Sequence, residues 1–308
     1  MLKGIDVSEH QGRIDWEKVK DHIDFAILRV GYGRNNIDKQ FVRNIKECNK
    51  LGIPVGVYWF SYAYTVEMAK QEAKYVLEAI KTYRVEYPVF ADIEYDTLNY
   101  ARKNGVNISK RLATDMVKAF CSEIEGANYW TGNYANPDFI DNKFYQDELK
   151  RYSLWLAWYG ATENQAKSYS CQMWQHSEDG SIPGIGGSSV DMNYDYRDFG
   201  EAIRDKGLNH LDGSKPVVKP TTSTSKPKYR LVAQNGKCTI TVDKLNIRAL
   251  PSINSEIVGS YTRGESFVYD YYVDNEGYRW ISWIGASGKR RYMAVRVLST
   301  NKKYGNCV

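Results

Sequence analysis

Short apolar runs alternate with helical patterns along the first two hundred residues of the chain. Apolar residues recur every three or four positions over 65–81 and again over 112–120, which predicts amphipathic helices there. Between such patterns lie short runs rich in β-branched and aromatic residues, which predict strands. The strand candidates are Gly4–Val7, Phe25–Val30, Ile53–Phe60, Pro88–Glu94, Asn128–Thr131, Leu154–Trp158, Gln172–Trp174 and Val190–Asn193.

This alternation predicts parallel strands joined by crossover helices. Eight strand candidates within residues 1–210 predict a small TIM-like β/α barrel of the α/β class. The last strands follow one another too closely for full helices, so we expect the helices to be reduced. Functional residues of such barrels lie at the carboxyl ends of the strands.

The pattern changes beyond residue 210. Residues 211–228 contain three prolines, a Ser/Thr cluster and few large apolar side chains, which predicts a flexible linker. Residues 229–308 show only short β-type runs separated by turn residues, which predicts a small all-β barrel. We therefore expect domains at 1–210 and 229–308. The β-type runs are Thr239–Val242, Leu245–Arg248, Glu256–Tyr261, Ser266–Val273, Tyr278–Ile284 and Tyr292–Val297.

Charge divides at the same place. Residues 1–210 carry 26 basic and 30 acidic side chains, a net charge of −4, whereas residues 228–308 carry 13 and 6, a net charge of +7. A basic small domain beside an acidic larger one favours an anionic partner surface. The sequence has no helix-turn-helix, zinc-finger or RRM-type motif, which argues against nucleic acid. The 25 Tyr and 8 Trp residues are consistent with a protein that binds flat, hydroxyl-rich ligands such as sugars. They are equally consistent with a tyrosine-rich surface that binds no ligand.

Cysteine and histidine give little sign of metal chemistry. The five cysteines are scattered and contain no CxxC pair, which favours reduced, mostly buried thiols over a disulfide framework or a zinc site. The four histidines show no ligand-like spacing, so we expect no metal and no cofactor. No signal peptide precedes the first strand and no long apolar run occurs, so we expect synthesis in a cytoplasm without membrane insertion.

Acidic residues stand at the ends of three predicted strands. Asp6 lies at the first strand, Asp92 and Glu94 at the fourth, and Asp191 at the last. Barrel closure makes the first and last strands neighbours, so Asp6 and Asp191 should lie close together. Residues two apart on a strand share a face, about 6.5 Å apart along the chain. Asp92 and Glu94 should therefore point into one cavity, with Ile93 packed the other way.

Such a cluster of acids has a clear chemical use. Repulsion between like charges raises the pKa of at least one carboxyl group, which then donates a proton at neutral pH. Glycoside cleavage needs this donor and a second negative group beside the developing oxocarbenium ion. The alternative is a set of ordinary loop carboxylates that cap helices or form ion pairs. A lone DxE pattern would favour that alternative, but four acids in apolar strand contexts favour hydrolysis.

The chain contains seven sequence blocks in the order GIDVSEHQG, FAILRVGYG, IPVGVYWFSYA, PVFADIEYD, LWLAWYG, MWQHS and VDMNYD. In composition and order they resemble the signatures of family 25 glycoside hydrolases, the phage and bacterial muramidases. The resemblance implies hydrolysis of the β-1,4 bond between N-acetylmuramic acid and N-acetylglucosamine in peptidoglycan. It also implies that Glu94 is the general acid/base, that Asp92 supports the developing charge, and that Asp6 and Asp191 orient Glu94 and the sugar. Asp92 would either attack C1 or polarise the 2-acetamido group of the substrate, and the short DxE spacing favours the second route.

Aromatic and amide side chains at or just after predicted strand ends are candidates for substrate binding, because a glycan groove needs stacking faces and hydroxyl donors. Ordinary barrel packing is the alternative for each of them. We favour Tyr62 and Trp158 most. The full set is Tyr32, Tyr58, Tyr62, Trp130, Tyr134, Trp158 and Gln175.

The pieces LNIRALPSINSEIVGSYTRGESF and GYRWISWIGASGKRRYMAVR resemble bacterial SH3-like wall-binding domains. The resemblance implies that this domain holds wall peptide or an anionic wall polymer. The alternative is that Trp280 and Trp283 fill the core and that the basic run is a solvated turn. The residues considered for binding are Tyr271, Tyr272, Tyr278, Trp280, Trp283, Lys289, Arg290 and Arg291.

The combined expectation is a phage endolysin that is made in the host cytoplasm and cuts peptidoglycan after release. Three alternatives stay open at this stage. One is a bacterial autolysin, another a non-enzymatic peptidoglycan-binding protein on a lysozyme-like scaffold, and the third a chitinase-like enzyme.

Overall fold

The computed structural model describes residues 1–186, 189–212, 229–284 and 290–307. The chain forms two compact units, Met1–Lys219 and Pro220–Val308. Most of the linker expected at 211–228 lies outside the described residues, as does Lys289. No helix in the described part of the chain is long and apolar enough to cross a membrane.

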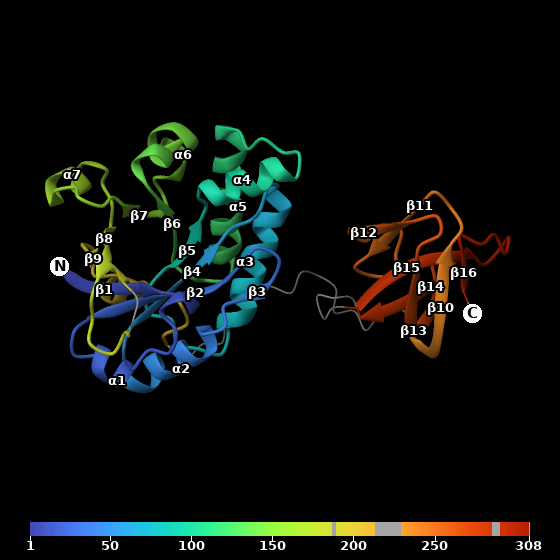
Figure 1. Cartoon of the computed structure of the whole chain (residues 1–308), viewed down its shortest axis with the longest axis horizontal. Coiled ribbons are helices and arrows are strands. Elements are labelled where there is room, and N and C mark those ends of the chain that lie inside the picture. Colours follow the sequence, from blue (N-terminus) through green and yellow to red (C-terminus); the bar gives the residue numbers. More distant parts are fainter. Residues whose placement is uncertain (187–188, 213–228, 285–289, 308) are drawn as a thin grey trace. The chain divides into compact units, whose positions relative to one another are not determined.

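The first unit is a closed eight-stranded barrel with few helices, as the sequence predicts (Figure 1). Its last strand is antiparallel to both neighbours, whereas the other seven strands are mutually parallel. A short strand at Asn36–Ile37, β3, pairs with the end of the second strand outside the ring. In order around the barrel the strands are β1 (Leu2–Val7), β2 (Phe25–Tyr32), β4 (Val55–Phe60), β5 (Val89–Asp92), β6 (Thr131–Ala135), β7 (Ser153–Ala157), β8 (Met173–Gly180) and β9 (Val190–Asp195), and β9 pairs with β1.

The helices between the strands range from four to 17 residues, and those after β6 and β7 have only four and six residues. The helix expected over 65–81 spans Val66–Ile80, and Thr65 caps it, because its Oγ1 accepts a hydrogen bond of 3.2 Å from Met68 N. The connection from β8 to β9 has no helix in its described residues. The helices are α1 (Trp16–Val19), α2 (Phe41–Leu51), α3 (Val66–Ile80), α4 (Tyr95–Lys103), α5 (Lys110–Gly126), α6 (Gln146–Leu149), α7 (Glu163–Ser168) and α8 (Phe199–Asp205), with a 3-10 turn at Glu9–Gln11 and a π-helical turn at Phe139–Lys143.

A layer of large apolar side chains fills the barrel. Phe25, Phe90 and Trp155 pack together in it, and Phe199 of α8 packs against Phe90. Glycines on neighbouring strands make room for these rings: a Cβ atom on Gly4 would collide with the ring of Phe25. Because side chains alternate along each strand, Asp6 and Asp92 face inward two positions after Gly4 and Phe90 and lie in a polar layer over this apolar one.

The second unit is an antiparallel sheet in the order β12-β11-β15-β14-β13-β10-β16. Trp280 is fully buried in its core, as the packing alternative predicts for this residue. The strands are β10 (Val232–Ile240), β11 (Lys244–Arg248), β12 (Ile257–Thr262), β13 (Ser266–Asn275), β14 (Tyr278–Ile284), β15 (Arg290–Val297) and β16 (Gly305–Cys307).

One expectation about the cysteines is wrong. Cys238 on β10 and Cys307 on β16 face each other in the antiparallel register and form a disulfide bond. The pairing joins residues 69 positions apart, and only the fold brings them together. Cys48, Cys121 and Cys171 are free, buried thiols, as expected.

Candidate active site

All four predicted acids line one cavity of about 250 Å³ at the end of the barrel. Asp6 and Asp191 are direct partners in the register of β1 and β9. Asp92 is the last residue of β5, and Glu94 immediately precedes α4. The structure therefore brings together side chains that are up to 185 positions apart in the sequence.

Asp191 reaches this cavity in a way that the sequence does not indicate. It is the second residue of β9, so it lies at the start of its strand rather than at the end. Because β9 is antiparallel to β1 and β8, its start lies at the same end of the barrel as the carboxyl ends of the parallel strands. The expected location is right, but the expected strand end is wrong.

Backbone geometry places Asp92 and Glu94 on the same side of the chain. Glu94 has an extended backbone (φ −126°, ψ −174°), so the strand-like alternation continues past the end of β5. Ile93 points into the outer core and is only 3% exposed. Glu94 N donates to Thr97 Oγ1 (3.1 Å), and Thr97 Oγ1 donates to Ser61 O (2.6 Å), which ties this segment to the end of β4.

Burial and mutual repulsion keep a proton on the Asp92–Glu94 pair. Asp92 is 3% exposed, and burial followed by the charge of Glu94 raises its pKa well above the usual value. Burial also raises the pKa of the half-buried Glu94. Two such carboxyl groups cannot both ionise readily in a site with little water, so the pair shares a proton at neutral pH.

The second pair of acids differs in its hydrogen bonds. Asp6 Oδ2 accepts bonds from Gln175 Nε2 (2.8 Å) and Asn193 Nδ2 (2.7 Å), which favour its ionised form, although burial has the larger effect and raises its pKa. Burial and the neighbouring Asp6 raise the pKa of Asp191 to about 8. A second proton is therefore available beside the first pair.

The amide of Gln175 is held by two tyrosines. Tyr134 Oη and Tyr159 Oη both donate to Gln175 Oε1, at 2.8 and 2.7 Å, so its NH₂ group faces Asp6. Asn193 is fixed similarly, because Trp155 Nε1 donates to its Oδ1 (2.8 Å). The polar layer is thus a connected network.

The sequence-based prediction omits several residues of this site, among them Asn193, Arg29 and Tyr159. Asn193 could have been found, because it lies two positions after Asp191 and so shares a strand face with it. Arg29 is the one charged residue of β2, whose other residues are mostly apolar. It lines the cavity, and its Nε donates to Asp38 Oδ2 at 2.9 Å. Tyr159 gives no such signal, since its contact with Gln175 depends on the path of the chain after β7.

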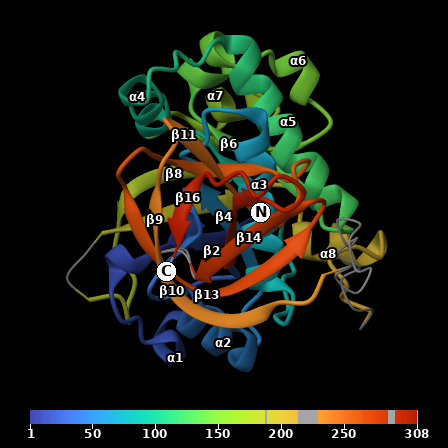
Figure 2. The same ribbon diagram turned by 90° about the vertical axis from the view of Figure 1, so that its right-hand side faces the viewer.

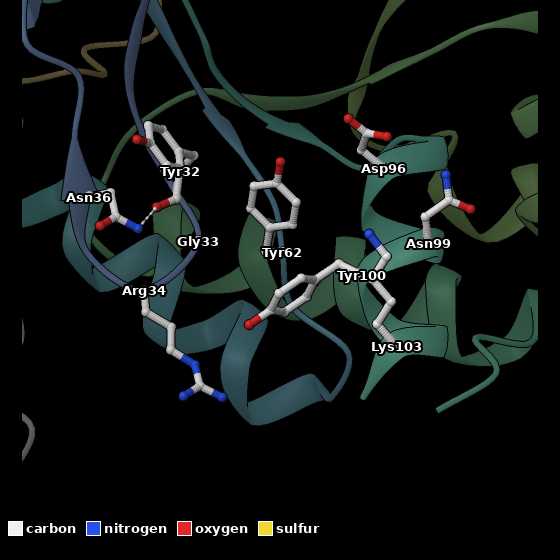
Figure 3. Close-up of a pocket in the computed structure, with 9 residues that line it drawn as sticks. All are labelled: Tyr32, Gly33, Arg34, Asn36, Tyr62, Asp96, Asn99, Tyr100 and Lys103. Carbon is white, nitrogen blue, oxygen red and sulfur yellow. Dashed lines mark hydrogen bonds between the residues drawn. The ribbon is translucent and has the colours of Figure 1, made fainter. Parts of the chain in front are cut away.

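The predicted binding residues divide into three groups. Tyr58, Tyr134 and Gln175 line the cavity with the acids. Tyr32 and Tyr62 lie in a separate, larger pocket of about 530 Å³ (Figure 3). Trp130 and Trp158, by contrast, line neither of these two pockets.

Neither tryptophan lines the cavity with the acids, contrary to the prediction from the sequence, and the reasons differ. The strand β6 starts at Thr131, so Trp130 precedes the strand and lies at the opposite barrel end, where its Nε1 donates to Ser153 Oγ (2.9 Å). Trp158 follows β7 as expected, but its ring packs edge-on against Tyr169 with centroids 5.6 Å apart. Both rings therefore contribute to packing.

In the second unit, the candidate aromatic and basic residues that the structure describes contact neighbours within the same unit. Arg290 pairs with Asp270 (2.6 Å), and its guanidinium lies 4.6 Å from the ring centroid of Tyr271. Trp283 packs against Phe267 with centroids 4.4 Å apart and is half-buried. The guanidinium of Arg279 lies 4.2 Å from the ring centroid of Tyr272. Tyr278 packs against Trp280 with ring centroids 6.1 Å apart. Arg291 also has a partner within the protein.

Comparison with known sequences agrees with this geometry. Residues 5–185 match the family described as glycosyl hydrolases family 25, and residues 232–295 match the bacterial SH3 domain. The YegX protein of Escherichia coli O157:H7 is 28% identical over 203 residues, which cover 62% of this chain and 68% of that protein. The autolytic lysozyme of Clostridium acetobutylicum is 24% identical over 216 residues, which cover 68% and 60% of the two chains.

Comparison of structures leads to the same group. The autolysin LytC of Streptococcus pneumoniae, solved with a synthetic peptidoglycan ligand, superposes with a TM-score of 0.56 at 30% identity. The match covers 62% of this chain and 46% of LytC, so the chain spans about half of that protein. The chain belongs to glycosyl hydrolase family 25 and is a glycoside hydrolase of the lysozyme type that carries a bacterial SH3 domain.

Proposed function

We propose that the protein is an N-acetylmuramidase that cuts the β-1,4 bond between N-acetylmuramic acid and N-acetylglucosamine in bacterial peptidoglycan. The observation that carries this proposal is the convergence of Asp6, Asp92, Glu94 and Asp191 on one cavity. The raised pKa values of these four carboxyl groups keep a proton in the cavity at neutral pH. The leaving oxygen must receive such a proton when the bond breaks.

In this proposal Glu94 is the general acid and Asp92 orients the substrate. Asp92 Oδ1 is buried and has no hydrogen-bond partner within the described part of the chain, so it is ready to accept a bond from an N–H group. The 2-acetamido group of the sugar offers that N–H. Accepting it stabilises the ionised form of Asp92, which leaves the shared proton on Glu94.

The bond changes then follow in two steps. Glu94 protonates the glycosidic oxygen as the C1–O bond breaks, and the acetamido oxygen forms a bond to C1. Water next attacks C1 and gives a proton to Glu94, so the acetamido oxygen is released and the acid is restored. Gln175 and Asn193 hold Asp6 in place beside this pair.

Direct attack of Asp92 on C1 is the alternative route. A substrate whose N-acetyl group has been removed separates the two. The assisted route predicts that such a glycan is not cleaved, whereas cleavage at a similar rate would support direct attack.

For the second unit we propose attachment to the wall. The bacterial SH3 match and the net charge of +7 over residues 228–308 support binding to wall peptide or to an anionic wall polymer. The peptidoglycan ligand found with LytC supports the same substrate class for the catalytic unit.

Reducing-end analysis of digested Gram-positive walls tests the bond assignment. The proposal predicts products with N-acetylmuramic acid at the new reducing end. N-acetylglucosamine at that end would contradict it. Cleavage of unmodified N-acetylglucosamine chains at an equal rate would support the chitinase-like alternative, and wall binding without cleavage would support a non-enzymatic role.

As the biological role we propose a phage endolysin, with a bacterial autolysin as the alternative. Production in a Gram-positive host distinguishes them. Lysis that occurs only after the membrane has been permeabilised supports the endolysin. Lysis of intact cells by protein found in the medium supports the autolysin.

A further inference from the structure

The larger pocket beside the acids has an aromatic floor and a charged rim. Three half-buried tyrosines, Tyr32, Tyr62 and Tyr100, form the floor. Exposed polar side chains surround them, and Figure 3 shows Arg34 and Lys103 on either side of Tyr62 and Tyr100. The pocket volume of about 530 Å³ is more than twice that of the acid cavity.

This pocket adjoins the acid cavity, because residues that line the one contact residues that line the other. Arg29 lines the acid cavity, and its guanidinium lies 5.3 Å from the ring centroid of Tyr32. Phe60 also lines the acid cavity, and its ring centroid lies 5.3 Å from that of Tyr62. A ligand that occupies the acid cavity therefore has the tyrosine floor directly beside it.

The rim of the pocket is positively charged, although the first unit as a whole is acidic. Residues 1–210 carry a net charge of −4, yet the rim holds two cations, Arg34 and Lys103, against the single acid Asp96. Arg34 Nη2 donates to Tyr64 Oη at 3.2 Å, which holds the guanidinium at the edge. Neither cation pairs with a carboxylate of the described residues, so both are available to a ligand.

Where a peptide branch is attached, the lactyl carboxyl group of N-acetylmuramic acid is held in an amide bond, so the substituted glycan backbone offers these cations no charged partner. Peptide branches on the strand carry carboxylates, which Arg and Lys recognise through charge-assisted hydrogen bonds. We propose that this pocket binds an anionic peptide branch of the substrate, with Arg34 and Lys103 on its carboxylates and the tyrosines under its apolar part. This inference rests on the proposed function and adds a selectivity to it.

The test compares two soluble glycan fragments, one with free carboxylates on its peptide branches and one with the same groups amidated. We expect wild type to cleave the free form about tenfold faster in kcat/KM, since each of the two exposed ion pairs contributes modestly to binding. The Arg34→Gln/Lys103→Met variant should lose this preference and retain the rate on the amidated form. Circular dichroism and thermal unfolding check that it is folded.

A control variant removes two positive charges from a surface of the first unit outside the pocket. Lys46→Met/Lys50→Gln changes two exposed lysines on α2, neither of which lines the pocket, and should keep the preference. Equal cleavage of both fragments by wild type, or an unchanged preference in Arg34→Gln/Lys103→Met, would overturn the inference.

Failure of the proposed function gives a different result. If wild type cleaves neither fragment, the muramidase assignment is wrong, and calorimetric titration of the same two fragments still tests the pocket. Tighter binding of the free-carboxylate form that disappears in Arg34→Gln/Lys103→Met supports the inference, and equal binding of both forms contradicts it.

Discussion

Gln175 Nε2 donates a hydrogen bond of 2.8 Å to Asp6 Oδ2, which joins β8 to β1 across the antiparallel strand β9 that separates them. Gln175 is 2% exposed and Asp6 is 4% exposed, so neither exchanges this bond easily for water. The position of Asp6 therefore depends on an amide that is itself fixed by Tyr134 and Tyr159.

Replacing that amide should reduce catalysis more than folding. Gln175→Leu removes one charge-assisted bond, worth about 1.5–3 kcal/mol, which corresponds to a roughly ten- to hundredfold fall in kcat/KM. Gln172→Leu is the matched control, because Gln172 precedes the same strand at the other barrel end and bonds to Leu154 N. Equal activity losses in the two variants, measured on soluble fragments, would count against this role of Gln175.

Glu72 predicts a pH dependence of stability. It is buried below the segment after β4, where Ser61 Oγ and Tyr62 N donate to its carboxyl oxygens at 2.6 and 3.0 Å, and burial raises its pKa to about 8. Between its usual pKa of 4.5 and pH 8 the folded state holds a proton that the unfolded state lacks. The free energy of unfolding therefore falls as pH rises through this window, by about 1.4 kcal/mol per pH unit for one proton.

Glu72→Gln should remove this one-proton contribution. Chemical unfolding of the full chain at pH 5 and pH 7.5, followed through the transition of the first unit, measures the change. We expect a smaller difference between the two pH values in the variant than in wild type. The same difference in both proteins would show that Glu72 does not carry the proton.

The disulfide should stabilise the second unit. Cys238→Ser/Cys307→Ser releases a cross-link over 69 residues, and such a loss typically costs about 2–4 kcal/mol of unfolding free energy. Denaturant titration of wall binding should show an earlier loss in this variant, while cleavage of soluble fragments stays unchanged. Reductant should destabilise wild type in the same way and leave the variant unaffected; destabilisation of both would indicate another cause.

The two units should contribute separately to activity on whole walls. Deleting residues 229–308 should weaken binding to purified walls more than it slows turnover of soluble fragments, because the four acids lie in the first unit. Binding by sedimentation and turnover by reducing ends measure the two effects. Equal losses on both substrates would contradict independent units.

The fold was predictable where apolar periodicity is clear. Six of the eight strand candidates overlap the observed strands closely, and the candidate Gln172–Trp174 covers only the start of β8. The fifth candidate, Asn128–Thr131, is displaced, because Tyr129 and Trp130 look more strand-like than Gly132 and Asn133. In the barrel Gly132 faces the ring of Phe90, which needs that space, and Asn133 is fully buried. Tertiary packing therefore overrides local propensity, and Trp130 was misplaced as a consequence.

The positions of the four acids were predictable from two geometric rules. Residues two positions apart on a strand share a face, which places Asp92 beside Glu94, and barrel closure makes the first and last strands neighbours, which places Asp6 beside Asp191. The contacts that hold them were harder to predict. Tyr159 reaches Gln175 only because the chain turns after β7, and the Cys238–Cys307 bond depends on a register between distant strands. Neither leaves a local pattern in the sequence.

Glu94→Gln provides the most direct test of the central claim, that Glu94 donates the proton to the leaving oxygen. The measurement is the rate at which reducing ends appear from purified walls, with Glu163→Gln on α7 as an exposed control. We expect Glu94→Gln to lose about 10²–10⁴-fold in rate, with wall binding retained and the control at the wild-type rate. Release of reducing ends by Glu94→Gln as fast as by wild type would contradict this claim.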